Sequence, residues 1–172
     1  MEKYLIVPIV KSPHMDSGRI GPKCKQDWYV GLEMAVKLHK DLRSSQIAVI
    51  TDFTTNGIHE ADIYDQALLA NGIEDHLIYR EGLETIGQIE AAKKIAEEGG
   101  QKLVLISTFL HRPRVEYYAG KGVLHRTAWG IPRPKEVIRD ILMIPLAPII
   151  RNFGLEERFM KRVTRRRTNG IL

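Results

Sequence analysis

Residues 103–106 read Leu-Val-Leu-Ile, and residues 47–50 read Ile-Ala-Val-Ile. Both runs are apolar without interruption and of strand length, which is typical of strands covered on both faces in a parallel sheet. Shorter or less regular runs predict three further strands. The five predicted strands are Tyr4 to Val10, Gln46 to Thr51, His76 to Tyr79, Lys102 to Ser107 and Leu124 to Trp129.

Segments with helical period lie between these runs. The first carries an apolar face from Trp28 to Leu42, and the second carries one from Ala61 to Leu68. Asn71 and Gly72 follow the second segment and are typical of a left-handed helix end.

The next two helices are marked by their first residues. Thr85 with Gln88 three residues later predicts a capping box, and this helix should end at Gly99 and Gly100. Pro113 predicts the first turn of a fourth helix, because a missing amide proton costs nothing there.

Strand and helix therefore alternate along the chain. This order predicts an α/β fold, a Rossmann-like three-layer sandwich with a mostly parallel sheet of about five strands. We expect this domain to cover residues 1–135 and a C-terminal helical extension to cover residues 136–172. Ligands of such sheets bind beyond the carboxyl ends of the strands, where the strand order reverses. The loops after the first four strands are therefore the ones expected to carry function.

The composition is that of a soluble globular protein. The chain has 172 residues, of which 44% are hydrophobic and 27% charged. A disordered chain, a fibrous repeat and a polytopic membrane protein are unlike this composition. The one cysteine, Cys24, cannot form an internal disulfide, and the short apolar run near the N-terminus resembles a strand more than a signal peptide. We therefore expect a cytoplasmic protein.

The formal net charge of +5 comes from the C-terminal residues. Residues 151–172 hold seven basic and two acidic side chains, whereas residues 1–150 hold equal numbers of each. The seven basic residues are Arg151, Arg158, Lys161, Arg162, Arg165, Arg166 and Arg167. A solvated extension and a contact with anionic lipid both fit this pattern. Nucleic acid is the less favoured partner, because the rest of the chain carries no basic stripe.

Residues 137–150 are apolar but shorter than the roughly 20 residues that cross a bilayer, and Pro145 and Pro148 interrupt them. Three interpretations stay open: a helix packed on the sheet, a contact between subunits of an oligomer, and an interfacial anchor at the inner face of a membrane.

The loop after the fourth strand is the main candidate site. It carries Ser107, Thr108, His111, Arg112 and Arg114 within eight residues and enters a helix. The first turn of a helix exposes unpaired amide protons, so two arginines and a histidine beside it suit a phosphate or a carboxylate. The alternative is that the arginines face solvent and that the histidine binds a backbone carbonyl.

The other loops add polar candidates. Glu81 could orient a hydroxyl, hold a cation or act as a base, and Thr85 could contact the ligand, although a helix cap explains it better. Asp52 stands where many α/β enzymes place a ribose-binding or catalytic acid. Glu60 and Lys11 complete the candidate ligand-binding residues.

Several well-known motifs are missing. Neither GxGxxG nor GxxxxGK[ST] follows the first strand, which weakens dinucleotide and P-loop interpretations. The sequence contains no HExxH, no CxxC and no GxSxG, so we predict no zinc site and no nucleophile elbow.

The order of the loop residues resembles the YdcF/SanA/ElyC-like family of bacterial proteins over most of the chain, best from Ile47 to Arg114. The matching residues are His59-Glu60-Ala61 after the second strand, Glu81 and Thr85 after the third, and Ser107, His111 and Arg114 around the fourth. The family's glycine pair after the first strand is missing, and Gln88 stands for its asparagine. The resemblance implies a Rossmann-like sheet with a polar pocket, S-adenosylmethionine binding as in YdcF, and cell-envelope maintenance as in SanA and ElyC.

Together these features predict that a phosphorylated or nucleotide-like small molecule binds at the carboxyl edge of the sheet. His111, Glu81 and Asp52 are the candidate catalytic residues if the protein is an enzyme of cell-envelope precursor metabolism. The cofactors left open are S-adenosylmethionine and a divalent cation. The alternatives are a non-catalytic binder of S-adenosylmethionine or a nucleotide, and a membrane-surface adaptor that uses the basic C-terminal residues.

Overall fold

The structure, a computed structural model, describes residues 2–10, 27–55, 58–82, 84–130, 134–155 and 158. The chain divides into two units, Met1–Pro132 and Arg133–Leu172. The first unit contains the sheet, which we call the sheet domain. The second contains α5 (Pro134–Asn152), which confirms that a helix follows the sheet.

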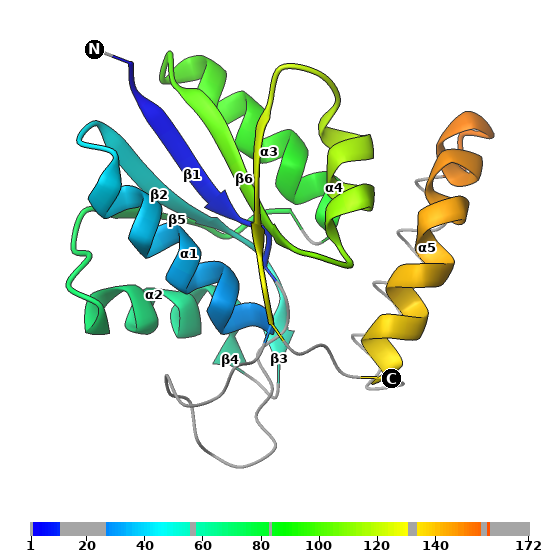
Figure 1. Ribbon diagram of the computed structural model, residues 1–172, viewed down its shortest axis with the longest axis horizontal. Coiled ribbons are helices and arrows are strands. Elements are labelled where there is room, and N and C mark those ends of the chain that lie inside the picture. The colour runs from blue at the N-terminus through cyan, green and yellow to red at the C-terminus, as the bar shows by residue number, and fades with distance from the viewer. Residues whose placement is uncertain are drawn as a thin grey trace. The chain divides into compact units, whose positions relative to one another are not determined.

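Five parallel strands form the sheet, in the order β5-β2-β1-β6-β7 (Figure 1). The strands are β1 (Tyr4–Pro8), β2 (Ser45–Ile50), β5 (His76–Tyr79), β6 (Lys102–Thr108) and β7 (Leu124–Ala128). The five predicted strands are thus confirmed, each within two residues at its ends, and the sheet is parallel throughout.

Four helices cover this sheet. They are α1 (Asp27–Asp41), α2 (Glu60–Ala70), α3 (Thr85–Glu98) and α4 (Arg112–Ala119). Figure 1 shows α1 and α2 on one face and α3 and α4 on the other. This arrangement confirms the predicted Rossmann-like sandwich.

The central strands are apolar because both of their faces are covered. Leu5, Ile6 and Val7 follow one another in β1 and therefore point to alternate faces, and all three are fully buried. The same holds for Ile47 to Ile50 in β2 and for Leu105 and Ile106 in β6. A single exposed face would have required alternating polar residues.

The helix ends follow the predictions in part. Gly72 has a φ of +75° and follows α2, and Ile73 N–H donates to the Leu68 carbonyl at 3.1 Å, so the left-handed end is confirmed. Pro113 lies in the first turn of α4, as predicted. The capping box at α3 is wrong: Glu84 is the N-cap, and Thr85 is already the first helical residue.

One further element was not predicted. β3 (Thr54–Thr55) and β4 (Ile58–His59) pair in an antiparallel two-stranded ribbon directly before α2. Two-residue strands carry too little of the alternating pattern to be recognised in a sequence.

Candidate functional site

The strand order reverses between β1 and β6. From β1 the chain continues to β2 on one side, whereas β6 lies on the other side of β1 and leads on to β7. The two strands stay paired beyond their ends, because Ile9 N–H donates to the Ile106 carbonyl at 2.9 Å. The loop between β6 and α4 therefore starts at the position where ligands of such sheets bind.

Three polar side chains meet beside this loop. Arg114 Nη2 lies 2.5 Å from His111 Nε2 and 3.4 Å from Thr85 Oγ1, and Thr85 Oγ1 lies 3.1 Å from His111 Nε2. His111 and Thr85 are buried, and Arg114 is half-buried. We call these residues the Arg114 cluster. Thr85 lies 26 and 29 residues before His111 and Arg114 in the sequence, so the cluster joins the start of α3 to the start of α4.

The chain turns sharply after β6, which brings His111 and Arg114 together. His111 N–H donates to the Thr108 carbonyl at 3.0 Å, and the His111 carbonyl accepts the first hydrogen bond of α4, from Val115 N–H at 3.1 Å. Residues three apart on a helix share a face. Arg114 therefore lies one turn from His111, on the same side of α4.

Thr85 reaches this cluster because the start of α3 is fixed from two directions. Gln88 Oε1 accepts a hydrogen bond from Val10 N–H at 3.0 Å and so ties α3 to the chain that leaves β1. Gly82 has a φ of +74°, and a Cβ atom there would lie 2.9 Å from Gln88 N. Only glycine allows both this backbone conformation and this close approach.

The contacts of the cluster define the protonation of His111. A guanidinium group only donates hydrogen bonds, so His111 Nε2 must accept one from Arg114. In this arrangement the imidazole is neutral and its proton is on Nδ1. Arg114 therefore brings the positive charge of its guanidinium to the first turn of α4, where the helix dipole also favours an anion.

Two buried hydroxyl groups lie next to the cluster in the sequence. Among the described residues, Ser107 Oγ and Thr108 Oγ1 have no hydrogen-bond partner, although both side chains are more than nine-tenths buried. Buried polar groups usually have a partner, because leaving one unpaired costs about 1–3 kcal/mol. An oxygen-rich ligand at the end of β6 would supply one.

Ser107 lies on the same side of the sheet as the cluster. Val104 and Ile106 belong to the apolar core that includes α1 and α2 side chains. Side chains alternate along a strand, so Ser107 faces α3 and α4.

Two of the predicted acids, Asp52 and Glu81, do not join the cluster directly. Asp52 and Glu81 are exposed, and no hydrogen bond or ion pair within the described residues links either of them to His111 or Arg114. Glu60 is fully buried in the first turn of α2, and its N–H donates to the Phe53 carbonyl at 2.9 Å. Among the described residues, no three His, Cys, Asp or Glu side chains are grouped so that they could hold a metal ion.

Arg112 points to a different neighbour from Arg114. Its Nε donates to Glu116 Oε1 at 2.7 Å, and its Nη1 donates to Thr127 Oγ1 of β7 at 2.8 Å. Its guanidinium is thus held at β7, whereas that of Arg114 is held at α3. Lys11, the remaining candidate, lies outside the described residues.

Two aromatic side chains follow β6 and β7, and the sequence analysis missed them. The rings of Phe109 and Trp129 are stacked, with centroids 5.1 Å apart and planes 12° from parallel. They are 52% and 74% exposed. Because each residue comes just after a strand, the pair lies at the same carboxyl edge as the loop that carries the cluster. Their separation in sequence hides this pairing.

His125, the second residue of β7, is a half-buried titratable group. Burial lowers the pKa of its imidazole below the ordinary value, and the Arg112 guanidinium lowers that pKa further, whereas the Glu116 carboxylate raises it. Burial has the largest effect, so His125 favours its neutral form.

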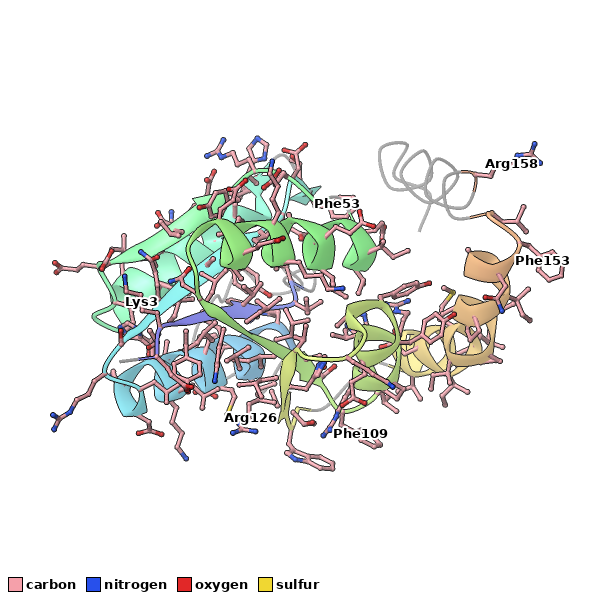
Figure 2. All side chains as sticks on the ribbon, turned by 90° about the horizontal axis from the view of Figure 1, so that it is seen from above. Lys3, Phe53, Phe109, Arg126, Phe153 and Arg158 are labelled. Carbon is pink, nitrogen blue, oxygen red and sulfur yellow. The ribbon has the colours of Figure 1, made fainter. Side chains whose placement is uncertain are left out.

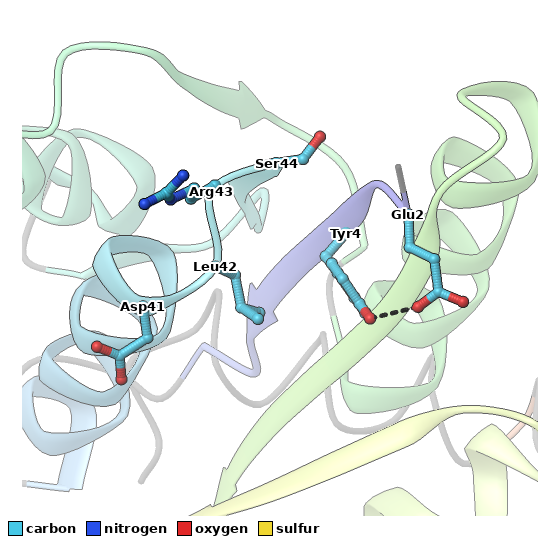
Figure 3. Close-up of a pocket in the computed structure, with 6 residues that line it drawn as sticks. All are labelled: Glu2, Tyr4, Asp41, Leu42, Arg43 and Ser44. Carbon is cyan, nitrogen blue, oxygen red and sulfur yellow. Dashed lines mark hydrogen bonds between the residues drawn. The ribbon is translucent and has the colours of Figure 1, made fainter.

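A shallow hollow of about 330 Å³ lies at the opposite edge of the sheet, where β1 starts (Figure 3). It is lined by Glu2, Tyr4, Asp41, Leu42, Arg43 and Ser44. Tyr4 O–H donates to Glu2 Oε2 at 2.6 Å, and the hydrogen bond from Lys102 is the main reason that the pKa of Glu2 is lowered. This amino edge of a parallel sheet is not where such folds bind ligands.

Comparison with known proteins does not identify this chain. No family model, curated protein or solved structure matches it. The resemblance to the YdcF/SanA/ElyC-like family therefore stays a prediction.

Proposed function

We propose that the protein binds a phosphorylated, nucleotide-like small molecule at the carboxyl edge of its sheet, beside the end of β6. The observation that supports this most is the Arg114 cluster, in which a guanidinium, an imidazole and a hydroxyl meet on the side of the sheet that buried Ser107 faces. A phosphate needs a positive charge and several donors from different directions, and this edge provides both.

The ligand's phosphate would use donors that the cluster already orients. The Arg114 guanidinium would contact it from α4, and the hydroxyls of Thr85 and Ser107 would donate to it from α3 and β6. The first turn of α4 adds the favourable end of its dipole. The body of the ligand would lie over the end of β6.

The nucleotide-like part of the proposal rests on Phe109 and Trp129. An exposed aromatic face stacks well on a nucleobase, whatever the base. Trp129 is the more exposed of the two rings, so its outer face is free for such stacking. Inorganic phosphate would use only the Arg114 cluster.

The geometry supports binding better than catalysis. Of the candidate catalytic residues, His111 belongs to the Arg114 cluster, and it would act as a general acid or base if a reaction takes place. Asp52 and Glu81 are exposed and would need to approach the ligand from their loops. A non-catalytic S-adenosylmethionine site is the alternative, since that molecule combines a carboxylate with an adenine.

A thermal-shift experiment with two matched arginine variants tests the proposal. The probes are adenosine and uridine diphosphates, inorganic phosphate, S-adenosylmethionine and a magnesium salt. A ligand of the native state raises the free energy of unfolding by ~2.7 kcal/mol at a hundredfold excess over its Kd. We expect Arg114→Gln to abolish the diphosphate shift and Arg112→Gln to retain it, because both residues lie in α4 but only Arg114 joins the cluster.

Further variants separate the parts of the site. His111→Gln should weaken the binding of the diphosphates and of inorganic phosphate alike. Trp129→Ala should weaken the binding of the diphosphates and leave the binding of inorganic phosphate unchanged. If Arg114→Gln and His111→Gln bind every probe as the wild type does, the assignment of the site is wrong.

A further inference from the structure

Helix α5 has one buried face. Asp140, Met143, Ala147 and Ile150 are all buried, and their spacing of three, four and three residues places them on one side of the helix. A helix that is covered on one side normally carries polar residues on the other.

A second side of α5, next to the buried one, is apolar and exposed. This side, together with Phe153 directly after the helix, carries large side chains at steps of four, four, three and four residues, and their exposed fractions range from 41% to 73%. We call these five residues the apolar stripe: Ile138, Leu142, Leu146, Ile149 and Phe153. Figure 2 shows Phe153 projecting from the end of α5. A continuous row of this kind marks an interaction surface rather than scattered surface residues.

The length of α5 fits a helix that lies on a membrane better than one that crosses it. The helix has 19 residues and contains Pro145 and Pro148, and within the described part of the chain no helix is long and apolar enough to span a bilayer. Helices with an apolar face and nearby basic residues bind in the plane of the headgroups.

The charge of the chain indicates what covers the stripe. The whole excess of positive charge lies in residues 151–172, which begin within α5, and the exposed Arg158 follows it. Anionic headgroups complement this charge. A second copy of the chain would add a second segment with the same positive excess, so a lipid surface fits better than self-association.

We infer that α5 docks on an anionic lipid surface, with the apolar stripe among the upper acyl chains and the basic C-terminal residues on the headgroups. This inference uses none of the residues of the Arg114 cluster. It therefore stands or fails separately from the proposed ligand site.

Vesicle co-sedimentation of the full chain tests it. Vesicles of phosphatidylcholine mixed with phosphatidylglycerol should bind the wild type at least about tenfold more tightly than vesicles of phosphatidylcholine alone, and added salt should weaken the binding. The double change Leu142→Gln with Ile149→Gln should lower the affinity about tenfold or more, because both residues lie at the centre of the stripe.

Two further variants control for folding and charge. Leu69→Gln replaces an exposed leucine of α2 and should bind vesicles as the wild type does. Replacing Arg165, Arg166 and Arg167 by glutamine should remove most of the preference for anionic vesicles. Circular dichroism checks that each variant stays helical.

Three results would overturn the inference. They are equal binding to both kinds of vesicle, unchanged binding of the stripe variant, and a wild type that ignores vesicles but forms a dimer that the stripe variant loses. The last result would assign the stripe to a contact between two copies of the chain.

Discussion

Gly82 controls the geometry of the Arg114 cluster although it makes no polar contact with it. Its φ is positive, and a Cβ atom at this position would lie 2.9 Å from Gln88 N, so there is no room for a side chain. Gln88 in turn holds α3 against the chain after β1, and α3 carries Thr85. A backbone contact thus positions a hydroxyl that lies three residues further on.

We therefore expect Gly82→Ala to lower the free energy of unfolding by at least twice as much as Gly100→Ala, and to weaken diphosphate binding. Both glycines have positive φ, but nothing lies within 4 Å of a Cβ atom at Gly100, so that variant suffers only the strain of about 1–2 kcal/mol. Urea denaturation measures the difference. If both variants lost the same free energy of unfolding, the close contact between residue 82 and Gln88 would be contradicted.

The half-buried His125 should make stability depend on pH. Because its pKa is lowered in the folded state, the unfolded chain takes up a proton more readily, and stability falls as the pH falls below the ordinary histidine value of 6.5. We expect His125→Gln to reduce this loss between about pH 7 and pH 5. Thermal melting across that range measures it, and parallel curves for variant and wild type would show that His125 does not contribute.

Among the secondary structure elements, the strands were the most predictable. A short, uninterrupted apolar run is typical of a strand that is covered on both faces. β6 is such a strand, and its Leu105 and Ile106 are fully buried. The two-residue strands β3 and β4 carry no such pattern and were missed.

Core packing in β6 should therefore dominate stability. We expect Leu105→Ala to cost about 2–5 kcal/mol, because it leaves a cavity between two covered faces. Leu124→Ala in β7 is the matched control: Leu124 is 45% exposed, and its loss should stay within about 0.5 kcal/mol. Chemical denaturation compares the two, and similar losses would mean that β6 is less enclosed than the structure shows.

At the start of α3, tertiary contacts replace the capping box that the local sequence predicts. The Thr85 and Gln88 spacing fits a capping box, yet Thr85 Oγ1 contacts His111 and Gln88 Oε1 accepts from Val10 N–H. Both partners come from other parts of the chain. The capping-box spacing does not predict these contacts, because it concerns only residues that are neighbours along the helix.

For the molecule as a whole, the sheet domain closes its core without the second unit. The described residues of its main apolar cluster all lie between Tyr4 and Ala128. We expect a fragment of residues 1–132 to unfold cooperatively and to keep the diphosphate-induced thermal shift, while losing any binding to anionic vesicles. Calorimetry of the fragment checks the first point, and a fragment without a cooperative transition would show that residues 133–172 are needed for folding.

The strand-helix alternation, the parallel sheet, the helical segment after it and the positive charge near the C-terminal end could all be predicted from the amino-acid sequence. These features follow from composition and periodicity, which act between neighbours in the chain. The folded structure was needed to show that Arg114 and Thr85 meet at His111, that Arg112 contacts β7, and that Phe109 stacks on Trp129. Such contacts depend on which strands and helices become neighbours and on the rotamers that packing leaves open, and residues 15 to 29 positions apart carry no local sign of either.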